Sequence, residues 1–280
     1  MRVFEKISEM REASRRNKRD GRSVGLVPTM GALHEGHLSL ARAAKQQCDV
    51  VAVSIFVNPT QFGPKEDFSR YPRTFERDCR MVEAEGVDFV FAPSAEEMYA
   101  EHSVTWIEVA GLSERLDGKS RPGHFRGVAT VVAKLFLIVE PDAGFFGQKD
   151  AAQLAIIRRM VRDLNFPIEI VGCPIVREKD GLAMSSRNAY LSGEERQLAL
   201  VLNRSLRAVE SAFQTGERRV EALIEIGKNA FSAQPAVRLD YFEIVNPETL
   251  DSSAKAEGSL VAVAAYVGTT RLIDNLLLQK

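Results

Sequence analysis

The chain is poor in residues that cross-link or bind metal in small domains. Its 280 residues include three cysteines, four histidines and one tryptophan. The cysteines, Cys48, Cys79 and Cys173, are odd in number, lie far apart and form no CxxC pair. This pattern argues against a disulfide framework or a zinc ribbon, and it predicts reduced thiols in a cytoplasmic protein.

The sequence also lacks long apolar runs and an excess of one charge. No apolar run approaches the length that spans a bilayer, and no charged start precedes an apolar core, so we expect neither a membrane span nor a signal peptide. The formal net charge of −1 gives no support to nucleic acid as a main partner. The basic stretch from Arg11 to Arg19 is interleaved with polar residues, which is typical of the solvated face of a helix.

Strand-like and helix-like segments alternate over the first part of the chain. The run DVVAVSIFV at residues 49–57 is nearly continuous in apolar residues, which is typical of a strand buried on both faces of a parallel sheet. Further strands are expected at residues 23–28, 87–92, 143–146 and 168–176, and helices at 38–46, 75–85, 127–139 and 151–164. The alternation predicts an α/β fold, a Rossmann-like doubly wound parallel sheet with right-handed crossovers.

The pattern changes after Val176. Two helices are expected at residues 193–213 and 218–231, followed by strands at 237–245, 260–267 and 271–278. Helices followed by strands, without strict alternation, indicate a smaller C-terminal α+β domain. We therefore expect domains at residues 1–176 and 177–280, with the loop from Arg177 to Asn188 as the hinge.

The stretch PTMGALHEGH, at residues 28–37, holds two of the four histidines. It follows the first clear strand and precedes a helix, and ligands of open α/β sheets bind beyond the carboxyl ends of the strands. Gly31 and Gly36 allow a ligand to approach the backbone closely, and the N-terminus of the following helix attracts anions. His34 and His37 share a helical face, so they are placed to donate hydrogen bonds to phosphate.

Two other interpretations of these histidines stay open at this point. A zinc site needs at least a third ligand, and the spacing HExH is not the HExxH of zinc proteases. Two satisfied structural histidines are the other alternative, but the glycine-rich turn between a strand and a helix favours phosphate binding.

A second segment, GLAMSSRN at residues 181–188, supports phosphate chemistry. It lies at the expected hinge and carries the hydroxyls of Ser185 and Ser186 and the guanidinium of Arg187. Such a loop can close over a triphosphate and stabilise charge as pyrophosphate leaves. By itself the tetrapeptide SSRN is weak evidence for a phosphate-binding loop, because many surface turns have a similar sequence.

These motifs together resemble a known family. PTMGALHEGH is similar to the HIGH signature of the nucleotidyl-transferase superfamily, and AMSSRN is similar to its KMSKS loop. The full set resembles the pantoate–β-alanine ligase (pantothenate synthetase) family over essentially the whole chain. In chain order it comprises VPTMGALHEGH, SIFVNPTQF, YPRT, RPGHFRGVATVV, FFGQKD, GLAMSSRNAYLS and GTTRLIDN.

The resemblance implies an ATP-dependent ligase of pantothenate biosynthesis. In that family the pantoate carboxylate attacks the α-phosphorus of ATP, which gives pantoyl adenylate and pyrophosphate. The amine of β-alanine then attacks the acyl carbon, which gives pantothenate and AMP. Magnesium (Mg²⁺) accompanies the nucleotide. The resemblance also implies that residues 1–176 bind nucleotide and pantoate and that residues 177–280 act as a lid.

The same resemblance implies roles for individual residues. The catalytic residues that it implies are His34, His37, Lys149, Ser185 and Arg187. The implied ATP contacts are these five together with Met30, Gly147, Asp150, Val176, Met184 and Ser186. The implied pantoate contacts are Met30, Gln61 and Gln153, and no metal ligand is assigned. From the residues alone, Lys149 and Asp150 would be interpreted as the solvated first turn of a helix, with Asp150 as its N-cap. Met30 would be interpreted as an ordinary core side chain.

Members of the family are usually homodimers, and the residues give this expectation weak support. Trp106 lies in a strand-like stretch with Val104, Ile107 and Val109 that can pack across a two-fold axis.

Two rival functions compete with this interpretation. Another nucleotidyl transferase would share the two loops, but a class I aminoacyl-tRNA synthetase would also need a tRNA-binding domain and a basic face. A nucleotide-binding regulator without catalytic activity would be expected to have lost some of the residues that contact phosphate. All of those residues are present here, which favours an enzyme.

Overall fold

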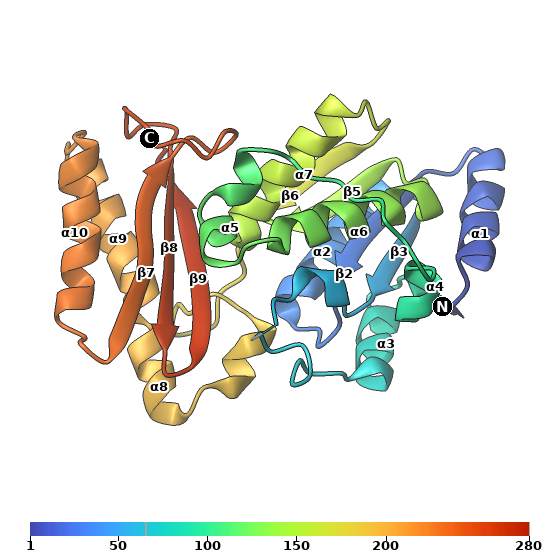
Figure 1. Cartoon of the computed structure of the whole chain (residues 1–280), viewed down its shortest axis with the longest axis horizontal. Helices are drawn as coiled ribbons and strands as arrows, with labels where there is room; N and C mark the ends of the chain where they lie inside the picture. The colour runs from blue at the N-terminus through green and yellow to red at the C-terminus, as the bar shows by residue number, and fades with distance from the viewer. Residues whose placement is uncertain (65, 280) are drawn as a thin grey trace.

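The computed structural model describes residues 1–64 and 66–279, and the first part of the chain forms a six-stranded sheet (Figure 1). Its strands are β1 (Arg2–Phe4), β2 (Val24–Thr29), β3 (Val50–Ile55), β4 (Phe89–Phe91), β5 (Ala143–Gly147) and β6 (Glu169–Cys173). Every neighbouring pair is parallel, and the spatial order is β1-β4-β3-β2-β5-β6. The Rossmann-like parallel sheet is confirmed, and β1 is an edge strand that the sequence pattern did not indicate.

Helices cover both faces of this sheet. They are α1 (Ile7–Arg19), α2 (Glu35–Gln47), α3 (Phe75–Ala84), α4 (Ala95–Met98), α5 (Asp117–Ser120), α6 (His124–Val139) and α7 (Ala151–Asp163). The 3₁₀ turns are η1 (Pro59–Gln61), η2 (Leu112–Glu114), η3 (Gln148–Asp150) and, in the C-terminal part, η4 (Ser186–Tyr190). Within the described residues, no helix is both long and apolar enough to cross a membrane.

The continuous apolar run of β3 serves two cores. Val50 and Ala52 pack on the side of α1, α6 and α7, while Val51 and Val53 pack on the side of α2 and α3. Successive side chains of a strand point to opposite faces, so a strand covered on both faces is apolar at every position.

The C-terminal part forms a second, smaller sheet. Its elements are α8 (Gly193–Ala199), α9 (Val201–Gln214), α10 (Val220–Ser232), β7 (Val237–Val245), β8 (Leu260–Val267) and β9 (Thr270–Leu277). The three strands are antiparallel in the order β7-β8-β9, which confirms the expected α+β domain. Along β8, Val261 and Val263 pack against α9 and α10, while Leu260 and Ala262 join the core of the first sheet.

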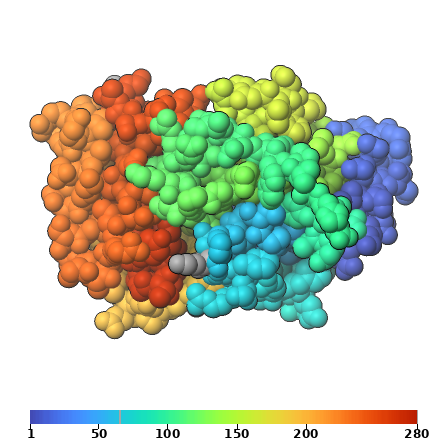
Figure 2. Space-filling view, viewed as in Figure 1, coloured from blue at the N-terminus to red at the C-terminus, as the bar shows by residue number. Residues whose placement is uncertain are grey.

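The two parts of the molecule are in direct contact. In Figure 2 the C-terminal part, orange to red, lies against the green segment around residues 110–130. Arg271 of β9 donates to Asp117 of α5 at 2.6 Å, and it also donates to Asp240 of β7 at 2.8 Å. Arg271 thus forms one ion pair across the boundary, with Asp117, and a second within the C-terminal sheet, with Asp240.

Two segments differ from the sequence-based expectation. The helix expected at 193–213 is divided into α8 and α9, because the backbone at Leu200 tightens to a ψ of −15°. The strand-like stretch around Trp106 has no regular structure. The N–H of Ile107 donates to the Thr130 hydroxyl at 2.9 Å, so it is not free to join a strand ladder.

The strand order reverses beside β2. From β2 the chain builds outward through β3 and β4, and it then returns to place β5 and β6 on the other side. β2 and β5 pair through Gly25 with Ala143 and through Leu26 with Gly144. Ligands of doubly wound folds bind at such a reversal, at the carboxyl ends of the strands.

A glycine on α6 lets η1 pack directly on the helix. A Cβ at Gly127 would lie 2.4 Å from the Thr60 carbonyl oxygen and 2.8 Å from the Cα of Gln61. Gly127→Ala should therefore displace η1 and lower the free energy of unfolding by about 1–3 kcal/mol, as overpacking does. Urea unfolding measures this change. Gly193→Ala is the matched control, because no heavy atom lies within 4 Å of that position, and unchanged stability of Gly127→Ala would contradict the packing.

Candidate active site

A cleft opens at the carboxyl ends of β2 and β5. Its empty volume is about 1210 Å³, part of which is open to solvent. Every residue that the sequence analysis assigned to the site lies in its wall, namely Met30, His34, His37, Gln61, Gly147, Lys149, Asp150, Gln153, Val176, Met184, Ser185, Ser186 and Arg187. The fold thus brings together segments that are far apart in the sequence.

A buried carboxylate holds the turn before α2. Gly31 and Ala32 have φ values of 81° and 50°, in the left-handed region that only glycine enters without strain. Asp78 of α3 is fully buried and accepts from the N–H groups of Ala32 (2.8 Å) and Leu33 (2.9 Å). Hydrogen bonds to a carboxylate are strong, so Asp78 fixes the turn that leads to His34. Asp78 was not predicted as a site residue, because an acidic residue in an amphipathic helix is normally solvated.

The two histidine rings cap the N-terminus of α2. The N–H of Gly36 donates to His34 Nδ1 at 3.1 Å, and the N–H of His34 donates to His37 Nδ1 at 3.3 Å. A backbone N–H can only donate, so each Nδ1 carries a lone pair, and the proton of each neutral ring is on Nε2. Capping thereby leaves two Nε2–H groups as donors beside the helix N-terminus.

Both rings are neutral at physiological pH. Burial lowers the pKa of His34 from 6.5 to about 4, and the positive charge of Lys149 contributes to the shift. Burial lowers the pKa of His37 to about 3, with smaller contributions from His34 and Lys149. Formal positive charge in the cleft therefore comes from Lys149 and Arg187 and not from the imidazoles.

A third histidine has the opposite tautomer. His124 Nδ1 lies 2.8 Å from the Gln61 carbonyl oxygen, and its Nε2 lies 3.0 Å from Arg121 Nη1. A carbonyl accepts and a guanidinium donates, so the neutral ring carries its proton on Nδ1. Burial, together with the charge of Arg121, lowers the pKa of His124 from 6.5 to about 3. Arg121 is paired in turn with Glu66 at 2.8 and 2.6 Å, so these contacts fix the main chain at Gln61.

The side chain of Gln61 lies between a thioether and an amide. Its Nε2 is 2.8 Å from Met30 Sδ, and its Oε1 accepts from Asn58 Nδ2 at 3.2 Å. Asn58, which the sequence analysis did not select, also donates to the Gly127 carbonyl and so ties η1 to α6. The apolar side chains that line the cleft near them are Phe56, Val128, Val131, Val132 and Leu135. This part of the cleft offers hydrogen-bonding groups beside an apolar surface.

Lys149 and Asp150 lie in η3, the single turn between β5 and α7. Asp150 occupies the N-cap position of α7, but its side chain makes no capping bond. Aspartate at an N-cap position usually accepts a hydrogen bond from the first turn of the helix, but Asp150 does not, and it lines the cleft instead.

The loop at 177–188 contacts the first part of the chain. The Ser186 hydroxyl donates to the Ala32 carbonyl at 3.0 Å, and Ser185 Oγ accepts from the N–H of Arg187 at 3.2 Å. Arg187 forms a two-point ion pair with Asp67 through Nε (2.9 Å) and Nη2 (2.8 Å). Its Nη1 is the part of the guanidinium that this pair leaves for another oxyanion.

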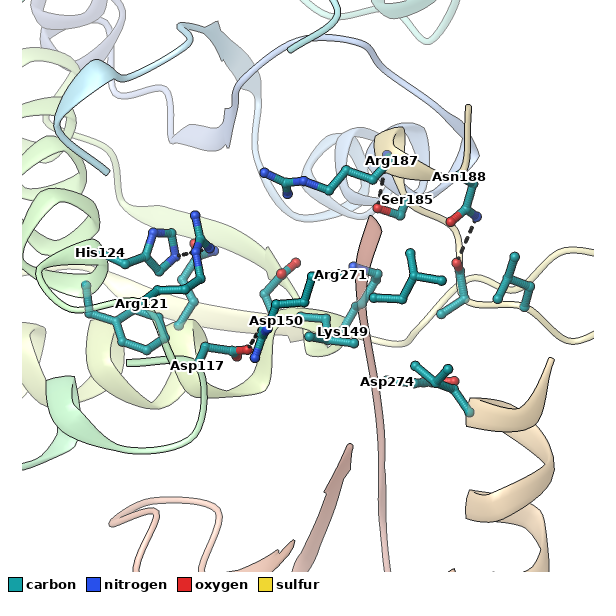
Figure 3. A pocket seen from close by; sticks show the side chains of 17 residues that line it. Asp117, Arg121, His124, Lys149, Asp150, Ser185, Arg187, Asn188, Arg271 and Asp274 are labelled. Carbon is teal, nitrogen blue, oxygen red and sulfur yellow. Dashed lines mark hydrogen bonds and ion pairs between the residues drawn. The ribbon is translucent and has the colours of Figure 1, made fainter. Parts of the chain in front are cut away.

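A smaller cavity of about 670 Å³ adjoins the cleft (Figure 3). The residues that it shares with the cleft are Lys149, Asp150, Gln153, Ser185 and Arg187. Its remaining charged walls come from Asp117, Arg121, Arg271 and Asp274. In Figure 3 dashed lines join His124 to Arg121 and Asp117 to Arg271. Lys149, Ser185 and Arg187 thus line a space that continues from the cleft toward strand β9.

Comparison with known proteins decides between the candidate activities. The chain matches the family described as Pantoate-beta-alanine ligase over residues 2–277. The chain belongs to the pantoate–β-alanine ligase family. It acts as a pantoate–β-alanine ligase, so the resemblance carried by its motifs is confirmed and the rival functions are set aside.

Individual relatives agree over nearly full length. Pantothenate synthetase of Acidobacterium capsulatum is 66% identical over 258 residues, which cover 92% of this chain and 86% of that protein. Pantothenate synthetase of Koribacter versatilis is 59% identical and covers 100% of this chain and 96% of its own. The solved pantothenate synthetase from Thermus thermophilus has a TM-score of 0.95 at 48% identity, with 100% of both chains covered.

A solved relative also carries ligands. Pantoate-beta-alanine ligase from Francisella tularensis, complexed with beta-gamma ATP and beta-alanine, has a TM-score of 0.82 at 34% identity. The superposition covers 99% of this chain and 97% of that one.

The buried histidines predict a loss of stability at mildly acidic pH. Their pKa is 6.5 when unfolded and about 3 or 4 in the folded protein, so below pH 6.5 the unfolded state binds more protons. The free energy of unfolding should therefore fall as the pH drops from 6.5 to about 5. Carboxylates titrate at lower pH, so histidines dominate this window. Urea unfolding at closely spaced pH values measures the slope.

A pair of histidine variants isolates the effect. His124→Gln should reduce the slope of unfolding free energy against pH by about one proton per molecule. His102→Gln is the matched control, because it removes a histidine whose side chain is 89% exposed and lies outside the cleft. An unchanged slope in His124→Gln would contradict a buried, neutral ring.

Proposed function

We propose that the cleft binds ATP and pantoate together and joins pantoate to β-alanine in two steps. The pantoate carboxylate attacks the α-phosphorus of ATP, and pyrophosphate leaves. The amine of β-alanine then attacks the acyl carbon of pantoyl adenylate, and AMP leaves. The observation that carries this proposal is that the histidine pair, Lys149 and Arg187 line the same cleft as Gln61 and Gln153.

At the phosphate end, hydrogen bonds and charge come from different residues. His34 and His37 donate from Nε2 beside the positive end of the α2 dipole. Lys149 supplies a mobile point charge, and Arg187 supplies a planar set of donors steadied by Asp67. Because these groups are in place before charge develops on the leaving pyrophosphate, they stabilise the transition state with little reorganisation. Ser185 and Ser186, in the same loop as Arg187, add further polar groups to the phosphate end of the cleft.

The other ligand groups are assigned by chemistry. The Gln61 and Gln153 amides both donate and accept, which suits the hydroxyls and carboxylate of pantoate. Met30 offers an apolar contact for its dimethyl group. For the adenosine part, Gly147 allows close approach, Asp150 suits the ribose hydroxyls, and Val176 and Met184 form the wall at adenine. The N–H of Met184 donates to the Val176 carbonyl at 3.0 Å, which fixes that wall.

Mg²⁺ fits this cleft as a companion of the nucleotide. Within residues 1–64 and 66–279, no group of three or more His, Cys, Asp and Glu side chains is arranged to hold a metal ion. Mg²⁺ does not require one, because it is commonly held by substrate phosphates, waters and one carboxylate. Phosphate oxygens and waters can supply its ligands here, so no protein carboxylate is assigned to the ion and Asp150 keeps its contact with the ribose. When bound, the ion neutralises phosphate charge, while the protein groups named above orient the reactants.

We also propose the domain roles and the compartment. Residues 1–176 bind nucleotide and pantoate, and residues 177–280 act as a lid through the loop that contacts Ala32 and Asp67. Closing the cleft protects the pantoyl adenylate from water before the amine arrives. The three free cysteines, two of them buried, support a reducing cytoplasm.

A homodimer is a further proposal, with the stretch around Trp106 in the interface. Val104 is 83% exposed and Trp106 is 43% exposed, which is unusual for large apolar side chains lying together. Arg126 lies over the Trp106 ring at 4.9 Å, so the stretch is held against α6 and not free in solution.

The adenylation role of His37 is tested by pyrophosphate release from ATP with pantoate alone. His37→Ala should lower this rate by roughly 10²–10³, the scale for losing one well-placed donor. His102→Ala is the matched control, because that ring is exposed outside the cleft, and it should retain the normal rate. A normal rate in His37→Ala would assign the ring to helix capping only. Absence of pantothenate and AMP from wild type with all three substrates would contradict the function itself.

The dimer is tested by sedimentation at micromolar concentration. A dimer of the 31.0 kDa chain should sediment at twice that mass. Val104→Asp should shift the population toward monomer, because it places a charge in the proposed apolar contact. Leu164→Asp, at an exposed apolar side chain at the end of α7, should not. A wild-type monomer would refute the interface.

A further inference from the structure

The end of β9 contacts the turn that carries Lys149. Asn275, which is 3% exposed, donates from Nδ2 to the backbone carbonyls of Gln148 and Lys149, both at 2.9 Å. Gln148 Nε2 lies 3.5 Å from Asn275 Oδ1. A side-chain amide has two N–H donors, so the donors of Asn275 are used on the main chain of η3.

Asn275 is itself fixed by its neighbour in β9. Its backbone N–H donates to Asp274 Oδ1 at 2.8 Å, and the Asp274 carboxylate accepts from Arg177 at 2.6 and 2.9 Å. Arg177 also donates to the Gly181 carbonyl at 3.1 Å. The end of β9 therefore holds two segments of the cleft at once, η3 and the loop at 177–188.

Local structure alone gives η3 little support. It is a single turn of three residues, and neither its N-cap residue Gly147 nor the α7 N-cap residue Asp150 makes a side-chain capping bond. The lysine side chain is long and flexible, so the main chain below it determines which region its ammonium can reach. Removing a buried donor would leave two carbonyls short of a partner, which is unfavourable.

We propose that Asn275 is a positioning residue for Lys149, and that docking of β9 places the lysine ammonium where the triphosphate binds. This inference rests on the proposed contact between Lys149 and the phosphates of ATP. It makes the C-terminal sheet part of the nucleotide site through the main chain of η3, in addition to the loop with Ser185 and Arg187.

Substitutions at Asn275 test the inference through ATP kinetics. Asn275→Asp keeps the side-chain shape but removes both N–H donors and places a carboxylate against two carbonyl oxygens. In pyrophosphate release, kcat/KM for ATP should fall about 10²-fold, the scale for an ångström-sized misplacement, while KM for pantoate stays unchanged. Asn275→Ser is milder and should give an intermediate loss. Asn17→Asp is the matched control, because its amide donates to the Ala13 carbonyl on α1, outside the cleft, and it should be normal.

A double-mutant cycle with Lys149→Ala separates positioning from a general loss of stability. If Asn275 acts through Lys149, Asn275→Ser should add nothing to the loss in the Lys149→Ala background. Equal fold losses in both backgrounds would overturn the inference. A lower melting temperature with unchanged kcat/KM for ATP would also overturn it. A normal kcat/KM for ATP in Lys149→Ala alone would instead overturn the proposed phosphate contact of Lys149.

Discussion

The cap of α2 is the interaction on which the rest of the site depends. Backbone N–H groups at a helix N-terminus need acceptors, and here two of them use the Nδ1 atoms of His34 and His37. The same bonds select the tautomer and leave Nε2–H available to a ligand. An imidazolium has no lone pair and would open the cap, so the cap requires the same neutral form that burial favours by lowering the pKa of each ring. Helix capping and anion recognition thus use opposite atoms of the same rings.

Buried polar groups hold the loops around this cap. Asp78 fixes the turn before α2, His124 fixes the main chain at Gln61, and Asn275 fixes the turn at Lys149. Each of these side chains bonds to the main chain of a segment distant in sequence. Because an unpaired buried polar group is unfavourable, these contacts specify one loop geometry in a way that apolar packing does not. The cleft is therefore preorganised by hydrogen bonds from helices α3 and α6 of the first part of the chain and from strand β9 of the C-terminal part.

Local sequence patterns allowed most of the elements to be predicted, whereas several cleft residues, such as Lys149 and Gln153, were assigned only through the family resemblance. β3 was recognisable because a strand covered on both faces is apolar throughout, and the two phosphate-type loops are contiguous motifs. Asp78 and Asn275 were not recognisable, because their partners are main-chain groups far along the chain, and such contacts leave no local pattern. The stretch around Trp106 shows the opposite case, since the hydroxyl of Thr130 takes an N–H that a strand would need. Tertiary contacts there override local preference.

The most direct test of the central claim is the protonation state of His34 and His37. ¹⁵N-detected NMR of imidazole-labelled protein near pH 7, with signals assigned through His34→Gln and His37→Gln, distinguishes the two neutral tautomers from the imidazolium. We expect both rings to be neutral, with the proton on Nε2 and a lone pair on Nδ1. Imidazolium signals, or a proton on Nδ1 of either ring, would contradict the capping arrangement and the phosphate site built on it.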